Sequence, residues 1–286
     1  MSKPRVAYMG PPRSFSHAAA LEMFGEQAEL QQTRTIQDAI EAAGSGEADL
    51  AIVPIENTTE GGVNATLDAL LDADVTISAE LVLDIELCLL ARSSDLSAIQ
   101  RVASHPQPLG QCKHWLRTHL PHAELVVAPS TTSAADSALA DAHTAAVGSR
   151  LAAEIGLVIV RERIQDHEGN ATRFVVVGQR LAAATGSDKT TLVFSTPHER
   201  GALRRVLEVF DEEGLNLTRI ESRPLRGRLL AAGGSPAQPW QYAFFTDLEG
   251  HREEPAVQRA LERIQAAGTL LRVMGSYPRA SGSHAG

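Results

Sequence analysis

Thr172 and Arg173 stand at the start of an apolar run, and this pair of side chains is the first candidate for chemistry. The run Phe174–Val177 is typical of a buried strand, so residues 170–178 place a hydroxyl and a guanidinium at the mouth of that strand. A guanidinium matches a carboxylate with two parallel hydrogen bonds, and a hydroxyl can donate to a departing oxygen. The competing interpretation is that Asn170 and Thr172 form a turn and that Arg173 is a surface arginine.

A second polar cluster follows the apolar stretch that ends near residue 55. Glu56, Asn57 and Thr58 come directly after it in V-P-I-E-N-T-T-E-G-G. Glu56 serves as a general acid or base if burial raises its pKa, whereas a carboxylate bonded to a neighbouring backbone is the simpler interpretation. Asn57 and Thr58 are candidate hydrogen-bond donors to a ligand.

Hydroxyl groups also precede two predicted helices. Ser14 and Ser16 in G-P-P-R-S-F-S-H, and Thr131 and Thr132 in P-S-T-T-S-A-A-D, can cap a helix and leave backbone N–H groups to bind an anion. A plain helix cap is the simpler interpretation of the first motif and an open alternative for the second. In S-H-P-Q-P-L-G-Q-C, two prolines fix the backbone around His105 and Gln107, and a rigid turn explains most of that segment.

Two successive patterns of predicted strands and helices must position these residues. From residue 4 to about 179, short apolar strands alternate with alanine-rich helices, which predicts parallel sheets covered on both faces, with ligands at the strand ends. Residues 181–189 are small and polar and are predicted to be a linker. From 190 to 279 the predicted order is strand, helix, strand, strand, helix, strand, a ferredoxin-like unit with a Gly/Pro/Ala-rich loop at 227–239.

The composition excludes several classes of protein. The chain has 286 residues, of which 43% are hydrophobic and 21% charged, as in ordinary globular proteins of one or two domains. No apolar run approaches the ~20 residues that span a bilayer, and the start of the chain resembles neither a signal nor a transit peptide. Two cysteines fit a reducing cytoplasm. A net charge of −9 argues against a nucleic-acid partner. The usual nucleotide, zinc and nucleophile-elbow motifs are absent, which predicts no cofactor and no metal.

Eight short motifs, in order, carry a family resemblance over residues 5–279. They are G-P-x-x-S-F-S (10–16), P-I-E-N-T-x-x-G-x-V (54–63), H-P-Q-x-L-x-Q-C (105–112), T-T-S-A-A (131–135), N-x-T-R-F (170–174), G-A-L (201–203), E-S-R-P (221–224) and G-S-Y-P (275–278). The chain resembles prephenate dehydratase, the monofunctional type with a C-terminal ACT regulatory domain. The resemblance implies an α/β catalytic domain over 4–180 with two lobes like a type II periplasmic binding protein, then a ferredoxin-like α+β ACT domain over 190–279.

The same resemblance implies an activity and a set of residues. The enzyme would convert prephenate to phenylpyruvate, CO2 and water in phenylalanine biosynthesis, as a cytoplasmic homodimer or homotetramer inhibited by L-phenylalanine. The catalytic residues would be Thr172, Arg173, Asn57 and Thr58. Substrate would be bound by Ser14, Phe15, Ser16, Glu56, Gln107, Thr131, Thr132, Asn170 and Phe174. L-Phenylalanine would be bound by Gly201, Ala202, Leu203, Asn216, Leu217, Glu221, Ser222, Arg223 and Pro224.

Some alternatives stay open at this point. Arg173 either clamps a substrate carboxylate or braces the lobe. Arg13, Gln165 and Arg200 depart from the family pattern, which usually has a glycine, an acid and a proline there; Arg13 either reshapes a tight turn or adds a cation near the site. An arogenate dehydratase and a non-catalytic amino-acid sensor are the competing functions.

Overall fold

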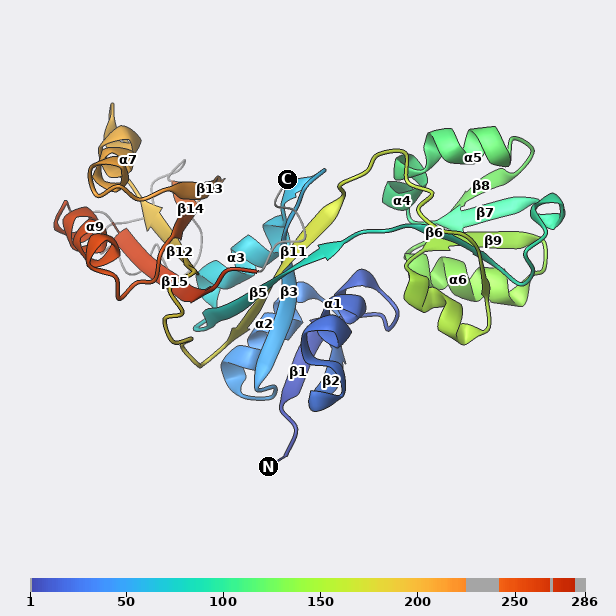
Figure 1. Ribbon diagram of the computed structural model, residues 1–286, viewed down its shortest axis with the longest axis horizontal. Coiled ribbons are helices and arrows are strands. Elements are labelled where there is room, and N and C mark those ends of the chain that lie inside the picture. Colours follow the sequence, from blue (N-terminus) through green and yellow to red (C-terminus); the bar gives the residue numbers. More distant parts are fainter. Residues whose placement is uncertain (1, 225–241, 268–269, 281–286) are drawn as a thin grey trace.

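Three β-sheets follow one another along the molecule (Figure 1), and each organises one part of the chain. The computed structural model describes residues 2–224, 242–267 and 270–280. The loop expected at 227–239 lies outside these residues. Within the described chain, no helix combines the length and the apolar character needed to cross a bilayer.

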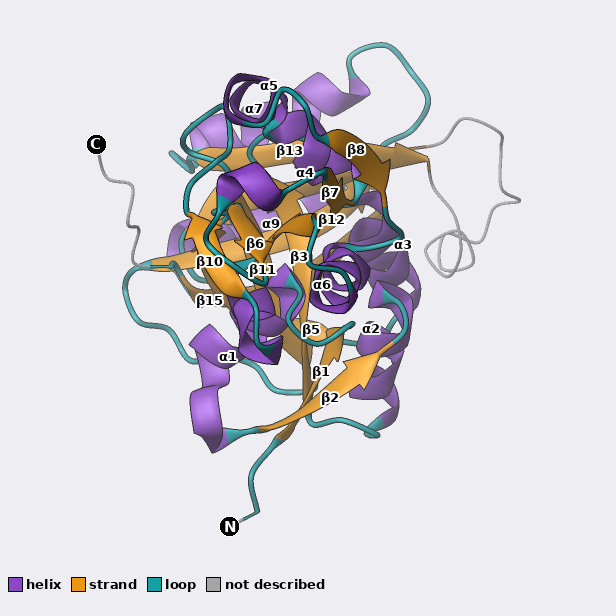
Figure 2. Cartoon of the chain, turned by 90° about the vertical axis from the view of Figure 1, so that its right-hand side faces the viewer, coloured by secondary structure: helices purple, strands orange, loops and turns teal. Residues whose placement is uncertain are grey.

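The first lobe is built on a sheet with strand order β2-β1-β3-β11-β5, in which β4 also pairs with β3. Its strands are β1 (Arg5–Met9), β2 (Glu29–Thr33), β3 (Leu50–Asn57), β4 (Gly61–Gly62), β5 (Thr76–Asp84) and β11 (Ala171–Gly178). Its helices are α1 (Phe15–Phe24), α2 (Ile36–Ser45) and α3 (Asn64–Asp72), with a 3₁₀ turn η1 (Gly25–Gln27). Helix α1 covers one face of the sheet, and α2 and α3 cover the other (Figure 2).

The second lobe lies between β5 and β11 in the sequence. Its sheet has the order β10-β6-β9-β7-β8. The strands are β6 (Cys88–Ala91), β7 (Arg101–Ser104), β8 (Glu124–Val127), β9 (Thr144–Gly148) and β10 (Val158–Arg161). The helices are α4 (Pro106–Gln111), α5 (Lys113–His119) and α6 (Thr131–Ala140), with 3₁₀ turns η2 (Leu96–Ala98) and η3 (Arg150–Ile155).

The expectation of parallel sheets is right for part of each lobe. β1 pairs in parallel with β2 and β3, and β7 pairs in parallel with β8 and β9. It is wrong for β11, which runs antiparallel to both β3 and β5, and for β6, which runs antiparallel to β9 and β10. The reason is connectivity: the chain leaves the first lobe along β5 and re-enters it along β11, so the two strands point in opposite directions.

The C-terminal unit has the predicted order of elements. It contains β12 (Asp188–Ser195), α7 (Ala202–Glu212), β13 (Leu217–Pro224), β14 (Tyr242–Glu249), α9 (Pro255–Ala266) and β15 (Leu270–Pro278). The antiparallel sheet has the order β13-β14-β12-β15. One correction concerns the linker predicted at 181–189, because β12 begins at Asp188. The Asp188 carboxylate accepts hydrogen bonds from Thr185 and Gly186, which closes a turn ahead of the strand.

The two faces of this C-terminal sheet have different neighbours. α7 and α9 cover one face, with Phe194, Val206 and Phe210 in their shared core. The other face packs on the first lobe, where Val193 and Phe245 join the same core as the residues of α2 and α3. The approach is close at Gly275 on β15, where an added Cβ would lie 2.1 Å from the carbonyl oxygen of Ile77. Glycine is therefore required at the point where the two domains meet.

Candidate active site

Thr172 lies on β11, the central strand that returns to the first lobe. Successive side chains of a strand point to opposite faces, so Thr172 and Phe174 share one face of the sheet. Both line a cleft, whereas Val175 on the other face packs in the core shared with the C-terminal sheet. Thr172 is 8% exposed. β11 therefore presents one hydroxyl group, well packed, at the wall of a cavity.

The amide of Asn57 fixes the direction of the Thr172 hydroxyl. Asn57 Oδ1 accepts hydrogen bonds from the backbone N–H groups of Thr59 (2.9 Å) and Glu60 (3.1 Å), which assigns the oxygen side of the amide. Its Nδ2 then donates to Thr172 Oγ1 at 2.9 Å and to Asn170 Oδ1 at 2.9 Å. Because Thr172 Oγ1 accepts this bond, its own hydrogen is turned elsewhere and can be donated into the cleft.

The cleft has a volume of about 510 Å³ and is lined by both lobes. It contains nine of the residues expected at the site: Ser14, Phe15, Ser16, Asn57, Gln107, Thr131, Asn170, Thr172 and Phe174. These come from segments more than 150 residues apart in the sequence. The sequence motifs thus converge on one cavity, at the strand ends where open α/β sheets bind ligands.

Two helix N-termini, one from each lobe, meet at this cleft. Ser14 caps α1 by accepting from the N–H of His17, and Ser130 caps α6 by accepting from the N–H of Ser133. The first-turn N–H groups of a helix have no partner within the helix, and the helix dipole favours an anion there. The cleft can therefore hold negatively charged groups at both ends, although the protein carries a net charge of −9.

Three expected site residues support the cleft without lining it. Thr58 Oγ1 accepts from the N–H of Ala171 (3.0 Å) and donates to the carbonyl of Gly169 (3.0 Å). Thr132 donates to the carbonyl of Pro12 at 3.2 Å, which joins α6 to the loop before α1. Glu56 points to the other face of the sheet, where its carboxylate lies 3.4 Å from Arg173 Nη1. Their contacts therefore indicate that these three residues support the site and do not bind the ligand directly.

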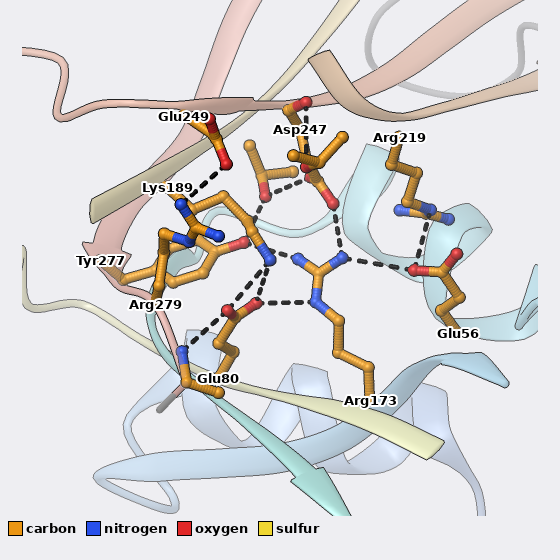
Figure 3. A network of polar contacts seen from close by, with 12 residues as sticks. Glu56, Glu80, Arg173, Lys189, Arg219, Asp247, Glu249, Tyr277 and Arg279 are labelled. Carbon is orange, nitrogen blue, oxygen red and sulfur yellow. Dashed lines mark hydrogen bonds and ion pairs between the residues drawn. The ribbon is translucent and has the colours of Figure 1, made fainter. Parts of the chain in front are cut away.

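Arg173 also faces away from the cleft, and this corrects the expected carboxylate clamp. Its side chain is 10% exposed and contacts Glu80, Asp247 and Tyr277 (Figure 3). Burial by itself lowers the pKa of a guanidinium, but Tyr277, Asp247 and Glu80 together hold the pKa of Arg173 above its usual value. The alternation of β11 made this inevitable: if Thr172 faces the cleft, its neighbour faces the opposite side. The bracing role is the one that the structure favours.

The cleft also contains residues that were not among the expected site residues. Glu60, His105 and Gln111 line the cleft, and Gln111 Oε1 accepts from Asn170 Nδ2 at 3.4 Å. Gln111 stands within H-P-Q-x-L-x-Q-C, so a signal for it existed in the sequence. Arg13 has a left-handed backbone, with φ 71°, and its guanidinium contacts Asp136 on α6 at 3.4 Å. The loop before α1 therefore makes a left-handed turn at Arg13, and the Arg13 side chain adds a contact between the lobes.

A second, smaller cavity of about 220 Å³ lies at the start of α7. It is lined by Gly201, Ala202 and Leu203 together with Tyr242 and Phe244 of β14. Gly201 has φ 79°, a left-handed conformation that favours glycine, and it directly precedes the first turn of α7. On β13, Ser222 and Pro224 pair with Phe244 and Tyr242. Five of the nine residues expected at the effector site thus lie in or beside this cavity.

The other four expected effector residues have different surroundings in a single chain. Glu221 and Arg223 face the first lobe, where Arg223 donates to Asp68 at 2.8 Å and Glu221 packs against Gly62. Leu217 packs against the core under α7 and α9, and the carbonyl of Asn216 accepts from the N–H of Glu249. The strand alternation of β13 explains the division, because Ser222 lies between the two charged residues.

Models of known families match the chain in two segments. The prephenate dehydratase model matches residues 6–182, and the ACT domain model matches residues 190–266. The first match alone covers more than half of the chain. The chain belongs to the prephenate dehydratase family. It contains the catalytic domain of that family of lyases, whose two lobes line the cleft, followed by an ACT domain.

Individual relatives agree with this assignment. The bifunctional chorismate mutase/prephenate dehydratase of Aquifex aeolicus (strain VF5) is 43% identical over 279 residues, which cover 97% of this chain and 74% of that protein. The crystal structure of prephenate dehydratase from Arthrobacter aurescens in complex with L-Phe has a TM-score of 0.84 at 36% identity, covering 99% of this chain and 92% of that one. A structure described as GqqA, a novel type of quorum quenching acylase, has a TM-score of 0.83 at 29% identity, covering 97% and 98%.

Proposed function

We propose that this prephenate dehydratase family member converts prephenate to phenylpyruvate, CO2 and water, with Thr172 assisting the departure of the hydroxyl group. The observation that carries the proposal is the fixed direction of the Thr172 hydroxyl. Asn57 Nδ2 donates to Thr172 Oγ1, so the hydroxyl hydrogen is available to a group in the cleft.

The reaction suits a site that positions and polarises its substrate. Prephenate is a cyclohexadiene with a carboxylate on one ring carbon and a hydroxyl on the opposite carbon. When the bond to the carboxylate breaks, its electron pair enters the ring and CO2 leaves; the pair of the C–O bond leaves with the hydroxyl, which becomes water on gaining a proton. The ring becomes aromatic, so the driving force lies in the substrate. The enzyme has to align the bonds and stabilise the charge on the leaving oxygen.

Thr172 is suited to the second task. A threonine hydroxyl is too weak an acid to lose its proton fully, so its role is a strong hydrogen bond to the leaving oxygen or relay of a proton through it. The bond that it accepts from Asn57 polarises the hydroxyl and strengthens its own donation. Phe174, on the same face two residues further, contributes an apolar wall beside the ring.

The two substrate carboxylates are assigned to the helix N-termini of the opposite lobes. Ser14, Phe15 and Ser16 begin α1, and Thr131 begins α6. Gln107 and Asn170 supply further amides from the second lobe and from the start of β11. Binding a dianion between the lobes draws them together without a cation for each charge.

We assign the effector L-phenylalanine to the cavity at Gly201. The first-turn N–H groups of α7 would bind its carboxylate, and Leu203, Tyr242 and Phe244 would surround its ring. β13 is an edge strand of the sheet, and Ile220 on it is 47% exposed. A homodimer, or a homotetramer built from it, that pairs at this edge would bring Asn216 of a second copy to the ligand. We place the enzyme in the cytoplasm, where Cys88 and Cys112 stay reduced.

One assay tests the catalytic assignment. Purified protein is incubated with prephenate, and phenylpyruvate is followed by the absorbance of its enolate in alkali. We expect turnover by the wild type and a loss of about 10²- to 10⁴-fold in Thr172→Ala. No phenylpyruvate from the wild type would refute the proposal. Arogenate, which has an ammonium in place of the keto oxygen, is compared with prephenate by kcat/KM.

A calorimetric titration tests the effector assignment. L-Phenylalanine should bind the wild type and lower its activity, whereas Gly201→Val should abolish both effects and leave the uninhibited kcat unchanged. A valine at this position adds a side chain to a left-handed residue at the cavity wall. Unaltered inhibition in this variant would place the effector elsewhere.

A further inference from the structure

The two faces of β11 carry different groups, and the face opposite the cleft is bound by the ACT domain. Thr172 lines the cleft, and Arg173 extends from the other face toward β14 and β15 (Figure 3). The strand is irregular at this point: Arg173 pairs with Glu56, but Phe174 pairs with Pro54, so β3 has one extra residue here. On the β3 side the ladder beside Thr172 is therefore interrupted, whereas the pairing with β5 stays in register from Ala171 to Val176.

Each nitrogen of the Arg173 guanidinium has a partner. Nε donates to Glu80 at 2.7 Å, Nη1 to Asp247 at 2.5 Å, and Nη2 to the hydroxyl of Tyr277 at 2.9 Å. Glu80 belongs to the first lobe, whereas Asp247 and Tyr277 belong to the ACT domain. Glu56 of the first lobe accepts a longer bond from Nη1 at 3.4 Å. Two of the four groups that contact this arginine thus come from the ACT domain, none of whose described residues lines the cleft.

The two ACT residues are themselves rigidly held. Asp247 and Tyr277 are fully buried. Thr191, on the strand between them, donates to Asp247 at 2.6 Å and lies 2.5 Å from the Tyr277 hydroxyl. Asp247 has a lowered pKa: burial opposes its ionisation, but Arg173 and Arg219 more than offset that effect. A buried, ionised carboxylate and a buried phenol form a fixed socket for the guanidinium.

We propose that Asp247 and Tyr277 are positioning residues for the dehydratase reaction, which hold Arg173 and through it the segment of β11 that presents Thr172. The proposal rests on the role of Thr172 given above. A planar guanidinium held at three edges fixes both the height and the rotation of its strand. Thr172 is the adjacent residue, so a shift of Arg173 moves the hydroxyl relative to the substrate, and small displacements of a reacting group lower the rate strongly.

The test compares three variants of the full-length chain. Asp247→Asn removes the charge, and Tyr277→Phe removes one hydroxyl with little change in volume. Asp188→Asn is the matched control, because Asp188 is also a buried ACT carboxylate, 3% exposed, but it accepts hydrogen bonds from Thr185 and Gly186 of the preceding turn. Steady-state kinetics are measured well below each Tm and normalised to the folded fraction.

We expect kcat to fall about 10- to 100-fold in Asp247→Asn and less in Tyr277→Phe, with KM within about twofold and with kcat unchanged in Asp188→Asn. In a Thr172→Ala background, Asp247→Asn should cause little further loss, because the group that it positions is gone. Three variants that lose stability but keep kcat would overturn the proposal and leave the cluster as a structural contact. So would full additivity with Thr172→Ala, or a change confined to KM.

If Asp247→Asn does not fold, the kcat and KM of Tyr277→Phe, alone and in the Thr172→Ala background, test the positioning proposal instead. A wild-type protein that forms no phenylpyruvate would instead refute the proposed function. The two failures are thus distinguishable, because the positioning proposal is judged from ratios of variant to active wild type.

Discussion

Replacing Asn57 by aspartate should reverse the hydrogen bond on which the catalytic proposal depends. In the wild type, Asn57 Nδ2 donates to Thr172 Oγ1 at 2.9 Å, while Oδ1 accepts from the N–H groups of Thr59 and Glu60. Asn57→Asp keeps the accepting oxygen and the shape of the side chain. The second oxygen can only accept, so the Thr172 hydroxyl turns toward it and no longer donates into the cleft.

The size of the effect follows from the lost donor. Removing one preorganised donor to a developing oxyanion costs about 2.7–4 kcal/mol, or about 10²–10³ in kcat. KM should change little, because the carboxylate-binding helix N-termini are untouched. The variant also loses stability, on the order of 1–3 kcal/mol, since Nδ2 no longer satisfies Asn170 Oδ1.

The matched control is Thr58→Val. Thr58 ties the same hairpin to residues 169–171 through the N–H of Ala171 and the carbonyl of Gly169, but it does not line the cleft. Its loss leaves a buried N–H without a partner and should cost a similar stability, on the order of 1–3 kcal/mol, while kcat falls much less than in Asn57→Asp.

The assay is phenylpyruvate formation over a range of pH, with urea unfolding to measure stability. The activity of Asn57→Asp relative to the wild type should rise as the pH falls toward the pKa of the introduced carboxyl group, because its protonated form donates again. An Asn57→Asp enzyme within a few-fold of wild-type kcat would refute the reasoning. Equal losses of kcat in Asn57→Asp and Thr58→Val would do so as well.

Three further outcomes are expected. Thr172→Ser should keep kcat within about tenfold of the wild type, since the hydroxyl survives, whereas Thr172→Ala should lose about 10²- to 10⁴-fold; equal losses in both would remove the hydroxyl from the mechanism. Arg173→Lys should lower Tm and kcat but leave KM for prephenate unchanged, because the guanidinium contacts Glu80 and Asp247 and lies outside the cleft. A rise in KM alone would show that Arg173 binds a substrate carboxylate. The pKa of Asp247 is lowered in the folded protein, so its ionisation stabilises the fold above the unfolded pKa of about 3.9, and this stabilisation is lost as the pH falls through the folded pKa. Below about pH 4, the free energy of unfolding measured with urea should therefore fall more steeply with pH for the wild type than for Asp247→Asn.

The sequence predicted the architecture well where local patterns decide it. Ser14 caps α1 as expected, and the first helix expected in the C-terminal unit is α7, with Val206 and Phe210 on its buried face. The cap of α6 is Ser130, one residue before the hydroxyl groups expected to cap it. The sequence failed for the direction of β11, because strand direction depends on how the chain crosses between lobes. Periodicity within one segment carries no information about such a crossing.

The candidate site was predicted in part for the same reason. Motifs after strands and before helices located Thr172, Asn57 and Ser14, which the fold brings to one cleft. The face of the strand was not used: the sequence analysis left Arg173 open between clamping the substrate and bracing the lobe, although adjacent strand residues point to opposite sides. Arg173 finds its partners Asp247 and Tyr277 more than 70 residues later in the chain, a pairing that no local pattern contains.

The insertion of the second lobe between β5 and β11 also sets an order of assembly during synthesis. All five strands of that lobe lie within residues 88–161, so its sheet can form before residue 171 leaves the ribosome. The sheet of the first lobe cannot be completed until β11 has been synthesised, because β11 lies between β3 and β5 and pairs with both. Until it arrives, those two strands expose unpaired edges that favour aggregation. The strand that carries the proposed catalytic hydroxyl is thus also the one that closes the sheet, so both the cleft and the sheet of the first lobe are completed only when β11 is in place.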